Sequence, residues 1–319
     1  MGLAYISLFE QVDIPEIQNY NFKVEILALQ GQKVGVIGGS QGLGSWLVGH
    51  LKEKKIEVKF TSADEYSELP SNKELLEFAD VVFLCVPISA METVMEEVYP
   101  YLQGKTLIEI CSVKKFVIEK YESLKQQYPD IETAFCSIHP MFGPRIHSLT
   151  GQVILFNHSD RIAEGIVEEL KEFFLEDHAQ VYNLPYLRHD KLMGVVQGLN
   201  HFNVFVSAKT LARFESEFED IKQVASPPYR IFIIFFTRYV LQNPRLYAEI
   251  QMNNEFVFEV VRIFRDEMNR LFDLIQTRDK EGFIKYIEDM QPYFASNKSD
   301  MEVSTHLIEQ LGEYLEKKN

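Results

Sequence analysis

The sequence predicts a doubly wound parallel α/β sheet in the first part of the chain and an all-helical domain in the second. Two observations carry this prediction: short β-branched runs alternate with helix patterns up to residue 185, and only long amphipathic helix patterns follow. Strands that alternate with helices are typical of βαβ units and a parallel sheet. We therefore expect an N-terminal extension over residues 1–30, an α/β domain over 31–185 and a helical domain over 186–319.

The expected strands are short runs rich in Val, Ile, Leu and Phe. They lie at 33–37, 56–60, 80–86, 106–110, 134–138, 152–156 and 180–184. The run at 80–86 is almost entirely apolar, which is typical of a strand buried on both faces of a parallel sheet. Helix patterns separate the strands at 42–54, 89–102, 114–127 and 161–175. In the helical domain, prolines interrupt the pattern at 226–228 and 243–244.

Composition excludes several classes of function. The 319 residues are 46% hydrophobic, which is enough for two packed domains, and the formal net charge is −15. No basic stripe is present, so we expect neither nucleic acid nor an anionic membrane surface as a partner. A few arginines in a pocket can still bind an anionic small molecule.

Cysteine usage and apolar runs indicate a soluble, cytoplasmic protein. Cys85, Cys111 and Cys136 lie far apart, so we expect free thiols and no metal site. The N-terminus lacks the pattern of a signal peptide, and the longest apolar run, 231–236, is too short to span a bilayer.

A glycine-rich segment follows the first expected strand and opens the first expected helix. It consists of Gly38, Gly39, Ser40, Gln41, Gly42, Leu43 and Gly44. A glycine loop in this position is typical of a Rossmann-like dinucleotide-binding domain, in which the backbone approaches a pyrophosphate at a helix N-terminus. The middle glycine of the motif is replaced by Gln41, unless the turn shifts by one residue to Gly42. A tight turn without a ligand is the alternative.

The end of the second expected strand bears on the choice of cofactor. Such domains carry an acid there that binds the ribose of NAD. In this chain Ser62 occupies the position, Asp64 comes shortly after it, and Lys59 is near. Hydroxyl groups tolerate a 2′-phosphate better than a carboxylate does. We therefore expect NAD(P)⁺ as the cofactor and favour NADP⁺ slightly over NAD⁺.

His139 directly follows an apolar strand. In open α/β sheets, ligands bind beyond the carboxyl ends of the strands. An unperturbed histidine pKa near about 6.5 suits proton transfer at neutral pH. We therefore consider His139 a candidate catalytic base, with a hydrogen-bonded structural histidine as the alternative.

The residues around His139 carry a family resemblance. The hexapeptide His-Pro-Met-Phe-Gly-Pro at 139–144 resembles that of the prephenate dehydrogenases. Similar segments follow the family's order at Val86-Pro87, Ser112-Val113-Lys114, His189-Asp190, Gln197-Gly198-Leu199, His201-Phe202, Ser226-Pro227-Pro228-Tyr229-Arg230 and Arg238. The resemblance covers about residue 32 to at least 250. We expect no chorismate mutase domain, which some relatives carry.

The resemblance implies a reaction and a set of catalytic residues. The reaction is the NAD(P)⁺-dependent oxidative decarboxylation of prephenate to 4-hydroxyphenylpyruvate, in tyrosine biosynthesis. His139 would accept the proton of the substrate hydroxyl, and Ser112 would bind that hydroxyl or orient His139. Arg238 would bind a substrate carboxylate through its planar, permanently charged fork.

Further binding residues and a homodimer follow from the same resemblance. Arg230, Gln197, His201 and His189 are candidate substrate contacts, and Val86 with Pro87 is expected at the cofactor. Gln197 and His201 lie four residues apart and would share a helix face, although both could instead be buried structural groups. The family forms homodimers through its helical domain.

Three alternatives remain. The first is a sister enzyme on the same scaffold whose substrate is arogenate or 4-amino-4-deoxyprephenate, each of which differs from prephenate by one amino group. Gln41 keeps open a degenerate homologue that binds a metabolite without oxidising it. A β-hydroxyacid dehydrogenase is the third, but those enzymes usually rely on a catalytic lysine in the helical domain.

Overall fold

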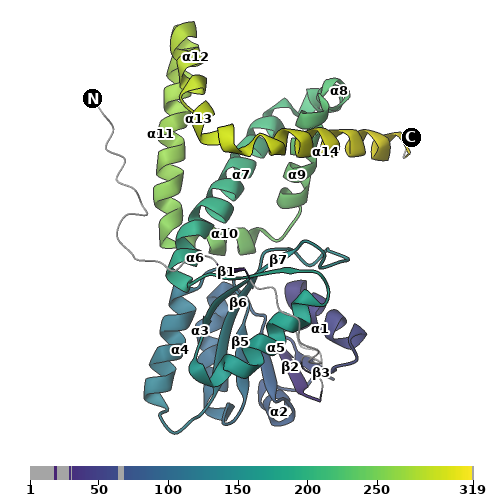
Figure 1. Ribbon diagram of the computed structural model, residues 1–319, viewed down its shortest axis with the longest axis vertical. Helices are drawn as coiled ribbons and strands as arrows, with labels where there is room; N and C mark the ends of the chain where they lie inside the picture. Colours follow the sequence, from purple (N-terminus) through teal and green to yellow (C-terminus); the bar gives the residue numbers. More distant parts are fainter. Residues whose placement is uncertain (1–17, 20–28, 30, 64–67, 318–319) are drawn as a thin grey trace. The chain divides into compact units, whose positions relative to one another are not determined.

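The computed structural model describes residues 18–19, 29, 31–63 and 68–317 (Figure 1). The chain divides into two compact units, Met1–Leu192 and Met193–Asn319. Nearly all of the expected N-terminal extension lies outside the described residues. Within the described part of the chain, no helix has both the length and the apolar character needed to cross a membrane.

The first unit is built on an eight-stranded sheet with the order β1-β8-β7-β6-β5-β4-β2-β3. The strands are β1 (Gln18–Asn19), β2 (Lys33–Ile37), β3 (Glu57–Thr61), β4 (Val81–Leu84), β5 (Thr106–Glu109), β6 (Ala134–Pro140), β7 (Val153–Ser159) and β8 (Gln180–Asn183). Pairing is parallel from β3 through β2, β4 and β5 to β6. The expected α/β fold class is confirmed.

The sheet departs from the all-parallel arrangement that the sequence predicts at β7 and β8, which run opposite to β6, and at β1, which pairs antiparallel with β8. β7 runs antiparallel to β6 and parallel to β8. The chain passes from β6 to β7 without an intervening helix. Parallel neighbours need a long crossover, usually through a helix, so a direct connection returns the strand in the opposite direction.

Helices cover both faces of this sheet. They are α1 (Gly42–Glu53), α2 (Asn72–Phe78), α3 (Ile88–Val98), α4 (Lys115–Gln127) and α5 (Glu164–Leu175), and α6 (Tyr186–Met193) follows the last strand. The strand residues Val36, Phe83 and Ile108 form one core cluster with residues of α1 and α5. Gly35 instead lies against Leu75 of α2, because alternate residues of a strand point to opposite faces.

Helix α2 lies in a segment for which the sequence pattern predicted no element. Its start is marked by a capping box: the Ser71 side chain accepts from the Glu74 N–H, and the Glu74 carboxylate accepts from the Ser71 N–H. The Ser-x-x-Glu spacing is a recognised start signal. The helix is short, so its periodicity is weak, and the cap was the only strong local sign.

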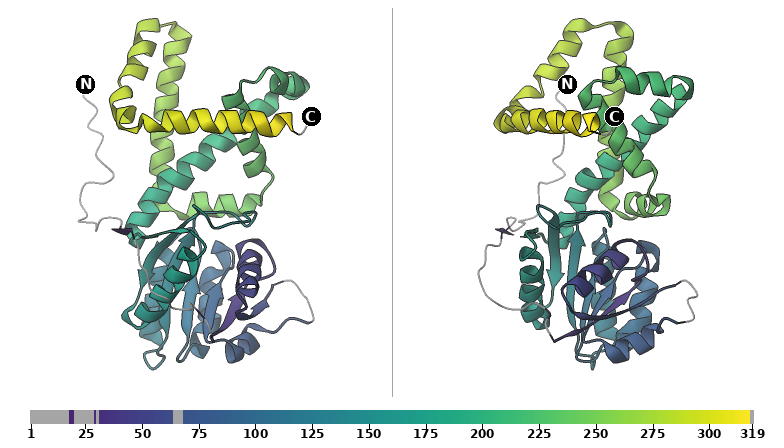
Figure 2. Two further views of the ribbon diagram at one scale, coloured as in Figure 1. Left: turned by 45° about the vertical axis from the view of Figure 1, so that its right-hand side comes forward. Right: turned by 90° about the vertical axis from the view of Figure 1, so that its right-hand side faces the viewer.

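The second unit is entirely helical in its described residues, as the sequence predicts (Figure 2). It contains the π-helical turn η3 (Gly194–Leu199), α7 (Asn200–Leu211), η4 (Ala212–Glu217), α8 (Phe218–Val224), α9 (Pro227–Val240), α10 (Pro244–Asn253), α11 (Glu255–Thr277), α12 (Lys280–Glu288), α13 (Gln291–Phe294), η5 (Ala295–Asn297) and α14 (Ser299–Glu316). Pro227 and Pro244 are the first residues of α9 and α10. Proline is favoured at this position, where its missing N–H would have no intrahelical acceptor.

Two glycines let the start of this unit pack closely on α11. A side-chain carbon at Gly194 would lie 3.0 Å from Phe256 Cβ, and one at Gly198 would lie 2.8 Å from Val257 Cγ2. Both distances are shorter than a carbon–carbon contact of about 3.5–4.0 Å. The close approach of η3 to α11 therefore requires glycine at these positions.

Candidate active site

The glycine loop lies where the order of the sheet reverses. β2 is followed by β3 on one side, and the chain then crosses to β4 on the other side of β2. This is the switch point at which open α/β sheets bind ligands. The loop after β2 and the segment Cys85-Val86-Pro87 after β4 flank that point. They lie close together, because a side-chain carbon added at Gly38 would be 3.3 Å from Val86 Cγ1.

Three glycines of the loop are required by close packing. A side-chain carbon at Gly38 would lie 2.5 Å from the Cys85 carbonyl oxygen, and one at Gly39 would lie 2.4 Å from Phe60 Cβ. A side-chain carbon at Gly44 would lie 2.1 Å from the Gly38 carbonyl oxygen. The N–H groups of Gly38 and Gly39 both donate to the carbonyl oxygen of Thr61, at 3.1 and 3.0 Å. The loop is thus held against the ends of β3 and β4.

Gly42 has the character of the missing middle glycine. Gln41 is extended, with φ −140° and ψ 166°, whereas Gly42 has φ +56° and nothing within 4 Å of the place of a side-chain carbon. The left-handed turn and the open space both fall at Gly42, so the turn is shifted by one residue. An open backbone at the start of α1 fits a pyrophosphate, because the first N–H groups of a helix lack intrahelical acceptors.

Hydroxyl groups occupy the end of β3. Ser62 Oγ lies 2.7 Å from Ser40 Oγ of the glycine loop, which brings two of the predicted cofactor residues together. Lys59 Nζ lies 4.3 Å from the centre of the Phe78 ring, a cation–π contact. Asp64 lies outside the described residues.

His139 is held in the last part of β6 by a second histidine. Its ring is 2% exposed, and its Nδ1 lies 2.8 Å from Nε2 of His189, on α6. Nδ1 of His189 lies 2.7 Å from Oδ1 of Asp190. Burial, and then the neighbouring His189 and Lys114, hold the pKa of His139 well below its ordinary value. The pKa near neutrality that the sequence suggested is therefore not that of the folded protein.

Asp190 joins these histidines to the start of α4. Its carboxylate accepts from the backbone N–H of Lys114, at 3.0 and 3.2 Å, and from that of Lys115, at 2.9 Å. Neither N–H has an acceptor within α4, so Asp190 acts as an N-terminal cap supplied from α6. Burial raises the pKa of Asp190, and these two backbone bonds oppose the rise.

A buried ion pair lies beside His139. Lys114 Nζ donates to Glu109 Oε1 at 2.8 Å and to the Ile138 carbonyl oxygen at 2.6 Å. Glu109 also accepts from the Ser137 hydroxyl and, at 2.8 Å, from the Cys111 N–H. Both charged side chains are fully buried. The network ties the ends of β5 and β6 to the start of α4.

Ser112 lies half-buried in the loop between β5 and α4. The contact that orients the His139 ring comes from His189 and not from Ser112. Two roles were expected for Ser112, namely orienting His139 and binding the substrate hydroxyl. The second role does not depend on the contact between His139 and His189, and it stays a prediction.

The remaining predicted residues lie in the second unit. His201, on α7, is 6% exposed and has the rings of Tyr247 and Tyr239 at 4.9 and 5.5 Å. Burial lowers its pKa to about 4. Burial raises the pKa of Tyr247 to about 12, and the charge of Arg238, which is exposed on α9, opposes this rise. His201, Arg238 and the two tyrosines thus gather at one place in this unit.

Two further predicted substrate residues, Arg230 and Gln197, also lie in this unit. Arg230 is exposed in the first turn of α9. Gln197 belongs to the π-helical turn η3, so the α-helical spacing that was expected to align it with His201 does not apply there.

Sequence reasoning missed the supporting residues Asp190, Glu109, Tyr239 and Tyr247. Asp190 belongs to the segment His189-Asp190 that carries the resemblance, but it was given no role, and Tyr239 is adjacent in sequence to Arg238. Within the described residues, no group of three or more His, Cys, Asp and Glu side chains is arranged to hold a metal ion.

Two family models match the chain. The nucleotide-binding domain of prephenate dehydrogenase matches residues 49–183, and the prephenate dehydrogenase dimerization domain matches residues 187–289. A probable arogenate/prephenate dehydrogenase of Methanocaldococcus jannaschii is 32% identical over 277 residues, which is 82% of this chain and 61% of that protein. The T-protein of Enterobacter agglomerans is 25% identical over 268 residues, covering 83% of this chain and 68% of that protein.

Solved structures share the fold. Prephenate dehydrogenase from Aquifex aeolicus, in complex with hydroxyphenyl propionate and NAD⁺, has a TM-score of 0.63 at 18% identity, covering 85% of this chain and 99% of that chain. Synechocystis arogenate dehydrogenase has a TM-score of 0.57 at 18% identity, covering 83% and 99%.

Proposed function

Since the chain belongs to the prephenate dehydrogenase family, we propose that it catalyses the NAD(P)⁺-dependent oxidative decarboxylation of prephenate to 4-hydroxyphenylpyruvate. The observation that carries the proposal is the placement of His139. It lies at the carboxyl end of β6, held by His189, in the same sheet whose switch point carries the glycine loop. Oxidation of a hydroxyl needs a proton acceptor, and a buried neutral imidazole supplies one.

The cofactor would be held at the switch point. Gly38, Gly39, Ser40, Gln41, Gly42, Leu43 and Gly44 would contact its pyrophosphate, with Ser62, Val86 and Pro87 beside them. When bound, NAD(P)⁺ supplies the acceptor of the hydride. The Ser40–Ser62 hydroxyl pair supports the preference for NADP⁺, because hydroxyl groups can donate hydrogen bonds to a 2′-phosphate.

His139 accepts the proton of the substrate hydroxyl in this proposal. Its depressed pKa keeps the ring neutral, and therefore able to accept, well into the acid range. Ser112 binds the same hydroxyl, and loss of the ring carboxylate as CO₂ makes the ring aromatic.

Substrate binding falls to the second unit. Arg238 binds a carboxylate, since its guanidinium is exposed, while its neighbour His201 is neutral and contributes an aromatic and hydrogen-bonding surface. Arg230 and Gln197 are secondary contacts in this proposal.

Arogenate is the second candidate substrate. The Methanocaldococcus jannaschii relative carries both names, arogenate and prephenate, and it covers most of this chain. 4-Amino-4-deoxyprephenate shares the same scaffold and belongs in the same comparison.

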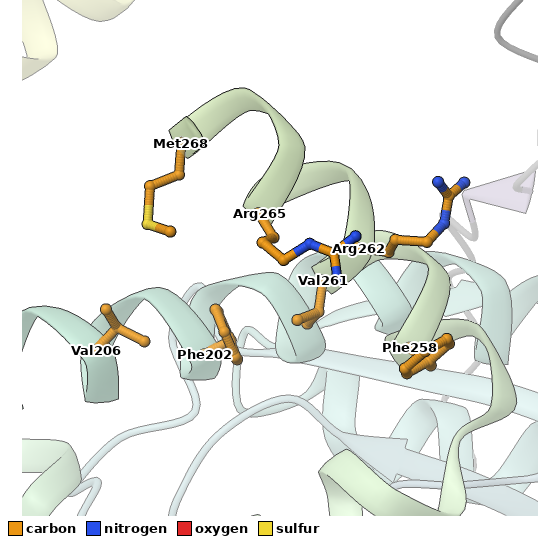
Figure 3. A pocket seen from close by; sticks show the side chains of 7 residues that line it. All are labelled: Phe202, Val206, Phe258, Val261, Arg262, Arg265 and Met268. Atoms are coloured by element: carbon orange, nitrogen blue, oxygen red, sulfur yellow. The ribbon is translucent and has the colours of Figure 1, made fainter. Parts of the chain in front are cut away.

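A homodimer through the second unit completes the proposal. That unit matches a dimerization domain and exposes large apolar side chains, including Phe258 and Phe272 of α11. Figure 3 shows part of this surface, where Phe202 and Val206 of α7 and Met268 of α11 line one apolar groove.

The test is turnover by the purified protein. Prephenate, arogenate and 4-amino-4-deoxyprephenate are each incubated with NAD⁺ and with NADP⁺, and the absorbance of reduced nicotinamide is followed. His139→Asn should lower kcat by about 10²–10⁴-fold, the usual contribution of a general base. It should leave the cofactor-induced shift in melting temperature intact.

His178→Asn is the matched control. His178 is exposed and has φ +63°, a conformation that asparagine tolerates well. It should keep full activity. No turnover of any of the three substrates, together with no cofactor-induced shift in melting temperature, would favour the degenerate homologue instead.

A further inference from the structure

Three side chains form a continuous hydrogen-bonded series that ends at the candidate base. Asp190 Oδ1 lies 2.7 Å from His189 Nδ1, and His189 Nε2 lies 2.8 Å from His139 Nδ1. The three side chains are 3%, 0% and 2% exposed, respectively. His189 was expected to contact the substrate, but both of its ring nitrogens already face protein partners.

The backbone determines the direction of the first bond. Both oxygens of Asp190 accept from the N–H groups of Lys114 and Lys115, which can only donate. A carboxylate that accepts from two backbone donors is held as an acceptor. His189 Nδ1, which faces Oδ1, must therefore carry a hydrogen and donate it to this oxygen.

The second bond follows from the first. A neutral imidazole has one N–H and one lone pair. With its hydrogen on Nδ1, His189 presents the lone pair of Nε2 to His139. His139 must then donate from Nδ1, and its own lone pair is placed at Nε2.

We infer, on the premise of the proposed function, that His189 and Asp190 are positioning residues: they hold His139 in the tautomer whose Nε2 accepts the substrate proton. Asp190 acts through His189, so neither residue needs to touch the substrate. The interposed histidine also keeps the carboxylate one ring away from His139, which avoids a direct ion pair that would favour the charged imidazolium.

The surrounding charges are consistent with two neutral rings. Burial, followed by the charge of Lys114, lowers the pKa of His189 well below its ordinary value, as it does for His139. Lys114 faces them from the start of α4, with its ammonium paired to Glu109 of β5. Asp190 contributes the negative charge on the α6 side.

Asp190→Asn should reverse the direction of both hydrogen bonds in this series. The amide oxygen would take over the backbone N–H donors, which leaves its NH₂ group facing His189 Nδ1. His189 would then carry its hydrogen on Nε2 and donate to His139, moving the hydrogen of His139 to Nε2. An amide in place of such a carboxylate imposes the wrong tautomer in the same way in serine proteases.

The experiment reads the tautomer directly. The full-length protein is labelled with ¹⁵N in its histidine rings, without substrate, and His139→Asn identifies the signal of His139. The wild type should show the unprotonated nitrogen of His139 at Nε2, and Asp190→Asn should show it at Nδ1. In parallel, kcat should fall by about 10²–10⁴-fold in Asp190→Asn with KM changed by less than about threefold.

Two variants at His189 keep the test independent of the stability of Asp190→Asn. In His189→Gln, the amide oxygen can accept from His139 and the NH₂ group can donate to Asp190, so the tautomer should persist and kcat should stay within about tenfold. In His189→Leu, His139 loses the acceptor of its Nδ1–H, and kcat should fall as in Asp190→Asn.

Asp160→Asn is the matched control. Asp160 is also a capping carboxylate: it accepts from the N–H groups of Phe135 and Ala163, but no hydrogen bond described for it involves a histidine. It should leave the His139 tautomer unchanged. A wild-type His139 protonated at Nε2, or an Asp190→Asn protein with the wild-type tautomer, overturns the inference. Failure of all substrates while the tautomers behave as expected overturns the proposed function alone.

Discussion

Lys114 shows how much a single residue can depend on one partner. Its ammonium is fully buried and is balanced by Glu109, which also binds Ser137 and the Cys111 N–H. Removal of one member of a buried pair leaves an uncompensated charge, which typically costs about 3–5 kcal/mol. Loss of a pair at the surface costs about 1 kcal/mol or less.

We therefore predict that Lys114→Met lowers the free energy of unfolding by about 3–5 kcal/mol, measured by urea denaturation. Adding Glu109→Gln should recover part of this loss, because the unpaired carboxylate is then removed. Lys120→Met, on the same helix and paired with the exposed Glu96, is the control and should cost about 1 kcal/mol or less. Equal losses for Lys114→Met and Lys120→Met would contradict the prediction.

His201 makes stability depend on pH. Burial lowers its pKa to about 4 in the folded protein, whereas the unfolded chain has the ordinary value near about 6.5. Between these values only the unfolded chain takes up the proton. The contribution is therefore fully favourable above about pH 6.5, and it is lost by up to about 1.4 kcal/mol per pH unit as the pH falls toward about 4.

The corresponding prediction compares melting temperatures of the wild type and His201→Gln between pH 7 and pH 4.5. The wild type should lose stability relative to the variant as the pH falls, because glutamine does not titrate. His139 and His189 act alike in both proteins, so the difference isolates His201. Two parallel curves would show that His201 keeps an ordinary pKa.

At the scale of elements, the loop between β2 and α1 contains one glycine that close packing requires, Gly39, and one that lies open to a ligand, Gly42. Gly39 has no room for a side chain, since Phe60 Cβ would lie 2.4 Å away. Gly42 has room but adopts φ +56°. Its open side is where the proposed pyrophosphate would approach the backbone.

We predict that alanine destabilises the protein at both glycines, for different reasons, and that it weakens cofactor binding at Gly42. Gly39→Ala should cost about 1–3 kcal/mol of stability through overpacking. Gly42→Ala should cost about 1–2 kcal/mol through its backbone conformation, and should also lower affinity for NAD(P)⁺ by about tenfold or more. Thermal denaturation and cofactor titration give the two quantities.

Gly49→Ala is the control within α1. Gly49 has nothing within 4 Å of the place of its side-chain carbon and no positive φ, so alanine should stabilise the helix by up to about 1 kcal/mol. Its cofactor affinity should match the wild type. If Gly42→Ala also keeps wild-type affinity, the pyrophosphate does not approach at Gly42.

At the scale of the whole molecule, the apolar surface of the second unit needs a partner. Phe258 is 78% and Phe272 is 60% exposed on α11, and Phe232 is 54% exposed on α9. Clusters of exposed aromatic side chains mark interaction surfaces, and homodimer interfaces are rich in them. The match to a dimerization domain supports a second copy of this chain as the partner.

We predict that the protein sediments as a dimer and that Phe258→Asp shifts it toward the monomer by at least about tenfold in dissociation constant, measured by analytical ultracentrifugation. Ile162→Asp is the control, since Ile162 is 61% exposed but lies in the first unit. A monomeric wild type, or equal effects of the two variants, would place the interface elsewhere.

Patterns within short segments of sequence determined the fold class, the glycine loop and His139. Strand and helix periods are local properties, and the hexapeptide at 139–144 is contiguous, so neither depends on how distant segments meet. These local patterns did not predict the antiparallel direction of β7 or the presence of helix α2. The first depends on the route of the connection, and the second on a cap rather than a period.

Only the tertiary structure decided what surrounds His139. Its bond to His189 spans 50 residues of sequence, and the bonds of Asp190 to Lys114 and Lys115 span 76 and 75. Such contacts depend on strand order and on where each helix begins, which no local pattern encodes. Burial has the same origin: a histidine has an ordinary pKa until neighbouring elements exclude water from it, so the sequence singled out His139 as a candidate and the fold determined its protonation.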